Sequence, residues 1–121
     1  KVCYKDMFRY FLAADIFVIT SHYEGTCMVI QEAAMAKKPI VSTPHAGAQE
    51  TIKDGRTGFI VDFGDYIGLS QKILYLLENT NIARDIGNRA YDFIINHYKK
   101  EEILENYYDM YEQTISRCPV Y

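Results

Sequence analysis

Two short apolar runs, separated by one helix-length segment, constrain the fold of this chain more than any other feature. The runs are DIFVIT at residues 15–20 and PIVST at residues 39–43. Both contain β-branched residues and are typical of buried strands in a parallel sheet. The segment between them, Cys27–Lys37, is predicted to be a buried helix with Thr26 as its N-cap. A strand, a helix and a strand in this order predict an α/β domain with a parallel sheet.

The rest of the chain continues this alternation and ends in helices. We expect a short helix before the first run, a helical turn after the second, a third strand, and three further helices with apolar residues at helical spacing. The expected bounds are Tyr4–Ala14, Ala48–Lys53, Phe59–Val61, Asp65–Glu78, Thr80–Asn96 and Lys99–Ser116. Doubly wound sheets usually have about five or six strands. The sequence therefore predicts half of a Rossmann-like parallel sheet, with about three strands, flanking helices and a C-terminal helical tail.

Composition and charge narrow the class of protein. The 121 residues are enough for one domain, taken as 1–121, and the net charge is −3. The nearest approach to a basic patch, Lys37-Lys38, is too short to indicate a nucleic-acid partner. No apolar run reaches the ~18 residues of a membrane-spanning helix, and no metal-ligand spacing is visible. The cysteines Cys3, Cys27 and Cys118 are widely spaced and odd in number, which indicates reduced thiols in a cytoplasmic protein.

A ligand site is expected beyond the carboxyl ends of the predicted strands, where open α/β sheets bind their ligands. Two loops lie there, Ser21–Thr26 and Pro44–Gly47. The helix that starts near Cys27 directs its free N–H groups and positive dipole end at the same place, which suits a phosphate. Gly25 lets the backbone come close to a ligand, although an ordinary turn role is the alternative.

Two acids, Glu24 and Glu32, flank this helix end. A charged group in an apolar run costs free energy unless it is paired, so Glu32 requires an explanation. Glu24 can accept hydrogen bonds from the hydroxyls of a sugar, and Glu32 from a diol such as a ribose. Two acids on either side of a phosphate site therefore suit a nucleotide-sugar.

The same residues have ordinary structural interpretations. Glu24 and Glu32 can be solvent-facing acids, as charged residues usually are. Cys27 is interpreted as a small buried residue, and a reactive thiol with a lowered pKa is the less favoured alternative. For His22 and His45, which lie in the two loops, packing or exposed roles are favoured over catalysis.

The order of the short motifs resembles a known family. The motifs follow one another from Ala14 to Asp65, within a match that spans roughly residues 13–116: ADIFVITS, Glu-Gly, Glu-x7-Glu, Ala-Met-Ala, PIVST, Asp-Gly-x-Thr-Gly and Gly-Asp. This series is similar to the donor-binding half of the retaining glycosyltransferases of the GT-B fold, the glycosyl transferases group 1 family. Glu-x7-Glu alone is a weak signal, whereas the ordered series is specific. The tail also resembles the closing helices of that family.

The resemblance implies a role for each matching residue. Glu24 matches a glutamate that contacts hydroxyls of the transferred sugar, and it is the expected catalytic residue. Glu32 matches the glutamate that binds the ribose hydroxyls, and Val29 a position beside the ribose. The segment whose backbone amides face the sugar and diphosphate is matched by Gly25, Thr26, Cys27 and Met28.

Three departures from the family pattern leave the sugar undetermined. Thr26-Cys27 stands where the family commonly has Phe-Gly, and Thr20 stands where it has Pro. The Gly-Gly loop of the family is His45-Ala46-Gly47-Ala48 in this chain.

The resemblance also implies partners. The donor is a nucleotide-sugar such as a UDP-sugar, with retention at the anomeric carbon, no obligatory metal and no other cofactor. The acceptor is expected to be a glycan, a lipid or a polysaccharide precursor. The family's Arg and Lys pair and its N-terminal acceptor domain lie upstream, so we expect a C-terminal fragment that is inactive alone. The full enzyme is expected in the cytoplasm, and contact with the inner face of a membrane is compatible with lipid-linked sugar pathways.

Alternatives stay open at this point. The chain can be a non-catalytic nucleotide-sugar-binding or assembly module, because fold does not fix function. A sugar-nucleotide epimerase fits the motif series less well. Without an upstream strand, DIFVIT is predicted to form an exposed apolar edge. That edge either supports self-association or is covered by an N-terminal or C-terminal helix.

Overall fold

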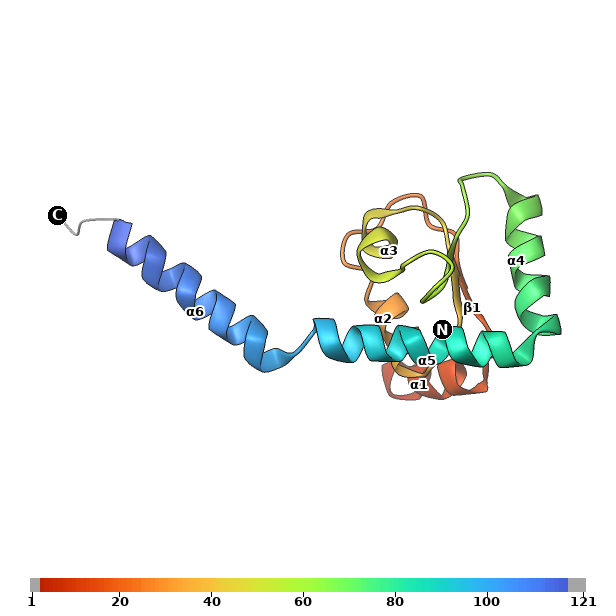
Figure 1. The fold of residues 1–121 in the computed structure, drawn as a ribbon, viewed down its shortest axis with the longest axis horizontal. Coiled ribbons are helices and arrows are strands. Elements are labelled where there is room, and N and C mark those ends of the chain that lie inside the picture. Colours follow the sequence, from red (N-terminus) through yellow and green to blue (C-terminus); the bar gives the residue numbers. More distant parts are fainter. Residues whose placement is uncertain (1–2, 118–121) are drawn as a thin grey trace.

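A three-stranded sheet with helices on both faces forms the body of the molecule (Figure 1). The computed structural model describes residues 3–117, so Cys118 lies outside the described residues. The elements are α1 (Tyr4–Ala13), β1 (Phe17–Ile19), α2 (Met28–Met35), β2 (Ile40–Ser42), α3 (Ala46–Thr51), β3 (Phe59–Ile60), α4 (Tyr66–Glu78), α5 (Thr80–His97) and α6 (Lys100–Arg117). The predicted fold class is confirmed.

The sheet is parallel and has the order β1-β2-β3. Val18 of β1 is paired with Val41 of β2, and Val41 with Phe59 of β3. Because all strands run in one direction, their carboxyl ends lie at one edge of the sheet, where the loops predicted to bind a ligand begin.

Neighbouring residues of β2 support two separate cores, as expected for a strand buried on both faces. Ile40 belongs to the cluster formed with α1, α2, α3 and the second half of α5. Val41 belongs to the cluster formed with β3, α4 and the first half of α5. Helix α5 therefore packs against both layers and fixes α2 and α4 relative to the sheet.

The largest differences from the predicted helix bounds, two residues each, are at the end of α2 and at both ends of α3, and the other helix ends differ by at most one residue. Helix α2 ends at Met35, two residues before the expected Lys37. The N–H of Lys37 donates to the Ala34 carbonyl and the N–H of Lys38 to the Ala33 carbonyl, which terminates the helix. Lys37 has a φ of 57°, the left-handed conformation that glycine usually supplies at such ends.

Helix α3 begins at Ala46, two residues earlier than predicted, because the side chain of His45 caps it. Nδ1 of His45 accepts a hydrogen bond from the N–H of Ala48 at 3.2 Å. The predicted N-cap of α2 was wrong. Cys27, not Thr26, occupies the N-cap position, and no side chain caps the helix.

Within residues 3–117, β1 is an edge strand that pairs only with β2, as expected for DIFVIT. Val18 is exposed, whereas Phe17 and Ile19 pack against the core, and the ring of Phe17 contacts Phe11 of α1. Helix α6 does not cover this edge but extends away from the body (Figure 1). Self-association through β1 stays a prediction. None of the described helices is long and apolar enough to cross a membrane.

Candidate donor site

The loops after β1 and β2 are tied together at the carboxyl edge of the sheet. Oγ1 of Thr43 donates a hydrogen bond to the carbonyl of Ser21 at 2.7 Å. Oγ of Ser21 in turn donates to Oε1 of Glu24 at 3.0 Å. Glu24 is half-buried, so its carboxylate is oriented by Ser21 while part of it remains accessible.

The amino end of α2 follows this loop directly. Of the three helices that follow a strand, α3 is capped by His45 and α4 by Asp65, whereas α2 has no side-chain cap. The N–H of Met28 donates to the Thr26 carbonyl at 3.1 Å, so a ligand at the Met28 amide would have to replace this bond. The N–H of Ile30 likewise donates to the Cys27 carbonyl at 3.1 Å. The N–H groups of a helix start are the donors that an anion can use.

A groove runs along one face of α2 from its first residue. It has a volume of about 580 Å³ and lies between α1 and α2, with Ile94 of α5 at its base. Met28 and Glu32 both line it, one helical turn apart. The full lining consists of Met7, Phe8, Phe11, Met28, Gln31, Glu32, Met35 and Ile94.

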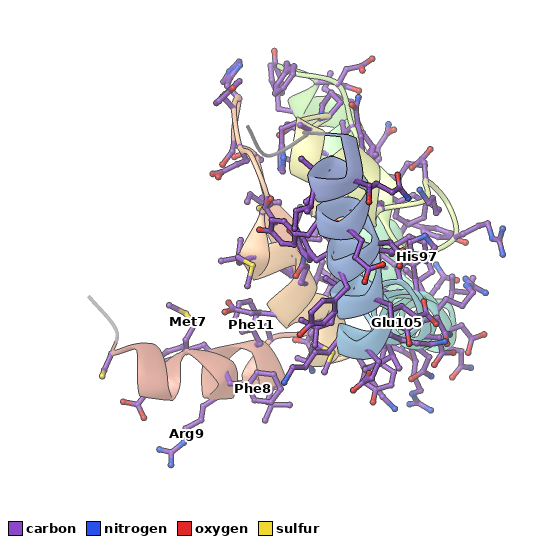
Figure 2. The ribbon with its side chains drawn as sticks, turned by 90° about the vertical axis from the view of Figure 1, so that its left-hand side faces the viewer. Met7, Phe8, Arg9, Phe11, His97 and Glu105 are labelled. Atoms are coloured by element: carbon purple, nitrogen blue, oxygen red, sulfur yellow. The ribbon has the colours of Figure 1, made fainter. Side chains whose placement is uncertain are left out.

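Helix α1 supplies the apolar wall of the groove. Met7 and Phe11 project from α1 on the side of α2, whereas Arg9 projects from the opposite side (Figure 2). Phe8 is 46% exposed and Met28 58% exposed, so an apolar surface stands open beside the Glu32 carboxylate. A flat, apolar group with hydroxyls at one end would match this combination.

The structure divides the predicted site residues between the loop before α2 and the groove along α2. Glu24, Gly25 and Thr26 lie in the loop, Met28 joins the loop to the groove, and Glu32 lies in the groove. The side chains of Cys27 and Val29 pack in or against the core and do not line the groove.

Sequence reasoning missed Gln31 and the aromatic residues of α1. Gln31 follows Met28 by three residues and precedes Met35 by four, a spacing that places all three on one helix face. That signal was present in the sequence. The contact of α1 with α2 was not, because it joins segments far apart in the chain.

Cys27 is a buried structural residue, not a reactive thiol. Only 4% of it is exposed. Burial raises the pKa of the Cys27 thiol and the nearby Glu24 carboxylate raises it further, while the neighbouring backbone of Ile30 and Val29 only partly opposes this. The helix dipole therefore does not produce a thiolate here.

The two histidines of the loops have packing roles. The ring of His22 stacks on Phe63, with the ring centres 4.7 Å apart. His45 is buried, and its Nε2 lies 3.2 Å from Oγ of Ser42. Since Nδ1 of His45 accepts from Ala48, Nε2 carries the proton and donates to Ser42.

A second hollow lies at the opposite, amino end of the strands. Its volume is about 340 Å³, and three cations, Lys37, Lys38 and Arg84, line it together with Asp15. No predicted site residue lies there. Within residues 3–117, no group of three His, Cys, Asp or Glu side chains gathers in a way that could hold a metal ion.

Comparison with known proteins agrees with the motif series. The model of the family named glycosyl transferases group 1 matches residues 1–93. The capsular polysaccharide biosynthesis glycosyltransferase CapM of Staphylococcus aureus is 30% identical over 106 residues, covering 88% of this chain and 28% of CapM. The chain thus spans well under half the length of the curated relatives it matches.

Two of the solved structures that match illustrate the shared fold. A mutant of TarM from S. aureus, in complex with fondaparinux, alpha-GlcNAc-glycerol and UDP, has a TM-score of 0.82 and 28% identity, covering 86% of this chain and 21% of TarM. The C-terminal domain of LpcC from Francisella tularensis has a TM-score of 0.75 and 27% identity, covering 83% and 51% of the two chains. This chain belongs to the glycosyl transferases group 1 family.

Proposed function

We propose that this chain is the donor-binding part of a retaining glycosyltransferase, which transfers a sugar from a nucleotide-sugar to a glycan, lipid or polysaccharide precursor. One observation carries the proposal. The loop that holds Glu24 leads into α2, and the first residue of α2, Met28, already lines the groove that holds Glu32. A carboxylate, a helix amino end and a second carboxylate thus follow one another. Sugar hydroxyls, diphosphate and ribose hydroxyls have the same order in a nucleotide-sugar.

In this proposal each acid has a separate task. Glu24, held by Ser21, accepts hydrogen bonds from hydroxyls of the transferred sugar and acts at the reacting end of the donor. Glu32 accepts from the ribose, and the apolar wall of Met7, Phe8 and Phe11 packs against the nucleoside. The backbone of Gly25, Thr26 and Cys27 approaches the diphosphate.

The charge of the diphosphate is balanced in part by the dipole of α2. No Lys or Arg of the described residues lines the groove, so the remaining positive charge is proposed to come from the Arg and Lys pair of the upstream segment. A helix end and two cations together stabilise a departing diphosphate without an obligatory metal ion. The chain spans 28% of CapM, and we propose that it needs the missing parts for transfer.

A titration with UDP, GDP and UDP-glucose tests the proposal on wild type, Glu24→Gln and Glu32→Gln. Glu32→Gln should weaken UDP and UDP-glucose equally, by about tenfold, because both carry the ribose. Glu24→Gln should weaken UDP-glucose by a similar factor and leave UDP unchanged, because only UDP-glucose carries the sugar. Comparison of UDP with GDP identifies the base.

Glu78→Gln is the matched control, since Glu78 is exposed at the end of α4. It should bind all three ligands as wild type does. Equal loss of UDP binding in both site variants would contradict the separate roles. Binding of none of the ligands would contradict a donor site formed by this chain on its own and would leave the assembly module as the alternative.

A further inference from the structure

Gly47, in the first turn of α3, packs against the backbone of the loop that follows β1. A Cβ atom at this position would overlap the carbonyl oxygen of Gly25 and would lie 2.7 Å from the nitrogen of Cys27. It would also lie 2.8 Å from the Cβ of Cys27. These neighbours are backbone or buried atoms, so they cannot rotate away as the end of a flexible side chain would. A side chain at Gly47 must therefore displace residues 25–27.

We infer that Gly47 is a positioning residue for the loop of residues 21–27, the donor loop, an inference that rests on the proposed function. Its missing side chain lets α3 lie directly behind Gly25 and Cys27. Since these residues lead into α2, the position of α3 sets where the loop amides stand relative to Glu24 and the helix end. Gly47 itself is not proposed to contact a donor atom.

Two further contacts keep α3 in place behind the loop. His45, buried at the start of α3, is joined to Ser42 of β2 and to Ala48 of α3. Thr43 donates to the carbonyl of Ser21, at the other end of the donor loop. Both ends of the loop are therefore fixed to the segment that follows β2.

Neighbouring positions show that this requirement is specific to Gly47. Ala46, the preceding residue, is exposed and carries a side chain without difficulty. Gly25 faces open space, because a Cβ atom there would have no neighbouring atom within 4 Å. A methyl group at Gly25 would enter the space of a ligand, whereas a methyl group at Gly47 would move the loop itself.

Amide NMR spectra of this chain, with and without UDP, test the inference on Gly47→Ala, Gly25→Ala and Gly58→Ala. Gly58 is the control, because its Cβ would also meet a backbone carbonyl, that of Ile40 at 2.7 Å, in a less crowded place away from the donor loop. Gly47→Ala should shift the amides of residues 25–28 without ligand and lower UDP affinity on the order of tenfold. Gly58→Ala should shift amides around Ile40 and leave UDP affinity unchanged.

The ligand-free spectra separate this inference from the proposed function. If wild type does not bind UDP, the donor-site proposal fails, while the shifts at residues 25–28 still decide the role of Gly47. Gly25→Ala should change the ligand-free spectrum only at its immediate neighbours. Unmoved amides at residues 25–28 in Gly47→Ala, or equal movement in Gly58→Ala, would overturn the inference.

If Gly47→Ala does not fold, Thr43→Val tests whether the segment after β2 positions the donor loop. This change keeps the side-chain shape and removes the hydrogen bond to Ser21. It should shift the amides of residues 21–25 and lower UDP affinity less than Gly47→Ala is expected to. An unchanged spectrum at residues 21–25 would overturn the role of the segment after β2.

Discussion

At the residue scale, the orientation of Glu24 depends on one hydrogen bond from Ser21. Removal of that donor by Ser21→Ala should lower the affinity for UDP-glucose by about fivefold, since a bond to a partly exposed carboxylate contributes about 1 kcal/mol. Affinity for UDP should not change. Ser70→Ala is the control, because Ser70 is exposed and bonds only the carbonyl of Ile67. An equal loss for UDP would show that Ser21 supports the whole loop instead.

The buried thiol of Cys27 gives a second prediction at this scale. Because its pKa is raised above the ordinary 9.0, little thiolate is present at neutral pH. Cys27 should therefore react with iodoacetamide more slowly than the exposed Cys3, as followed by peptide mass spectrometry. The contribution of the buried neutral thiol to the stability of the fold is fully present below pH 9.0. It is lost as the pH rises through the raised pKa of Cys27. Equal labelling rates for Cys27 and Cys3 would contradict the burial of Cys27.

At the element scale, the end of α2 stores backbone strain in Lys37. A lysine in the left-handed conformation costs about 1 kcal/mol relative to glycine. Lys37→Gly should therefore raise the free energy of unfolding, by about 0.5 kcal/mol once the loss of the Lys37 contact with the Tyr91 ring is included. Thermal unfolding followed by circular dichroism measures this. A destabilised variant would show that the ring contact outweighs the strain.

The types of the elements could be predicted from the sequence, and their ends could not. Strand and helix periodicities are local, and DIFVIT and PIVST contain β1 and β2. The ends of α2 and α3 depend on Lys37 adopting a positive φ and on the side chain of His45 turning back to Ala48. Lysine is not the usual residue at a left-handed helix end, and histidine is not a usual N-cap, so the sequence pattern did not predict these two helix ends.

The candidate site could likewise be predicted only in part, from residues that are close together in the sequence. The spacing of Glu24 and Glu32 and the position of Gly25 come from one continuous segment, and the family resemblance assigns them roles. The packing of Gly47 behind the loop and the wall that α1 adds to the groove join distant segments. Such contacts are set by tertiary packing, which a local pattern does not contain.

At the scale of the whole molecule, α6 contributes little to the stability of the body. Residues 101–116 are all exposed, and the helix projects away from the sheet (Figure 1). Removal of residues 100–121 should change the free energy of unfolding of the body by less than about 0.5 kcal/mol, because no buried contact is lost. Denaturant unfolding measures this. A loss above about 2 kcal/mol would show that α6 packs against the body in solution.

The two ends of the sheet offer competing places for a nucleotide. The carboxyl edge has the acids and the start of α2, whereas the amino edge has a hollow with Lys37, Lys38 and Arg84. Simple attraction of a diphosphate to positive charge favours the amino edge. Recognition of a nucleotide-sugar through its hydroxyls and phosphates favours the carboxyl edge.

The map of amide shifts on addition of UDP to the wild-type chain distinguishes these two places most directly. A donor site at the carboxyl edge predicts shifts at residues 25–28 and along the groove to Met35, with none around Arg84. Shifts confined to Asp15, Lys37 and Arg84 would mean that UDP binds only as an anion at the amino edge. That result would contradict a donor site formed by Glu24, the amino end of α2 and Glu32.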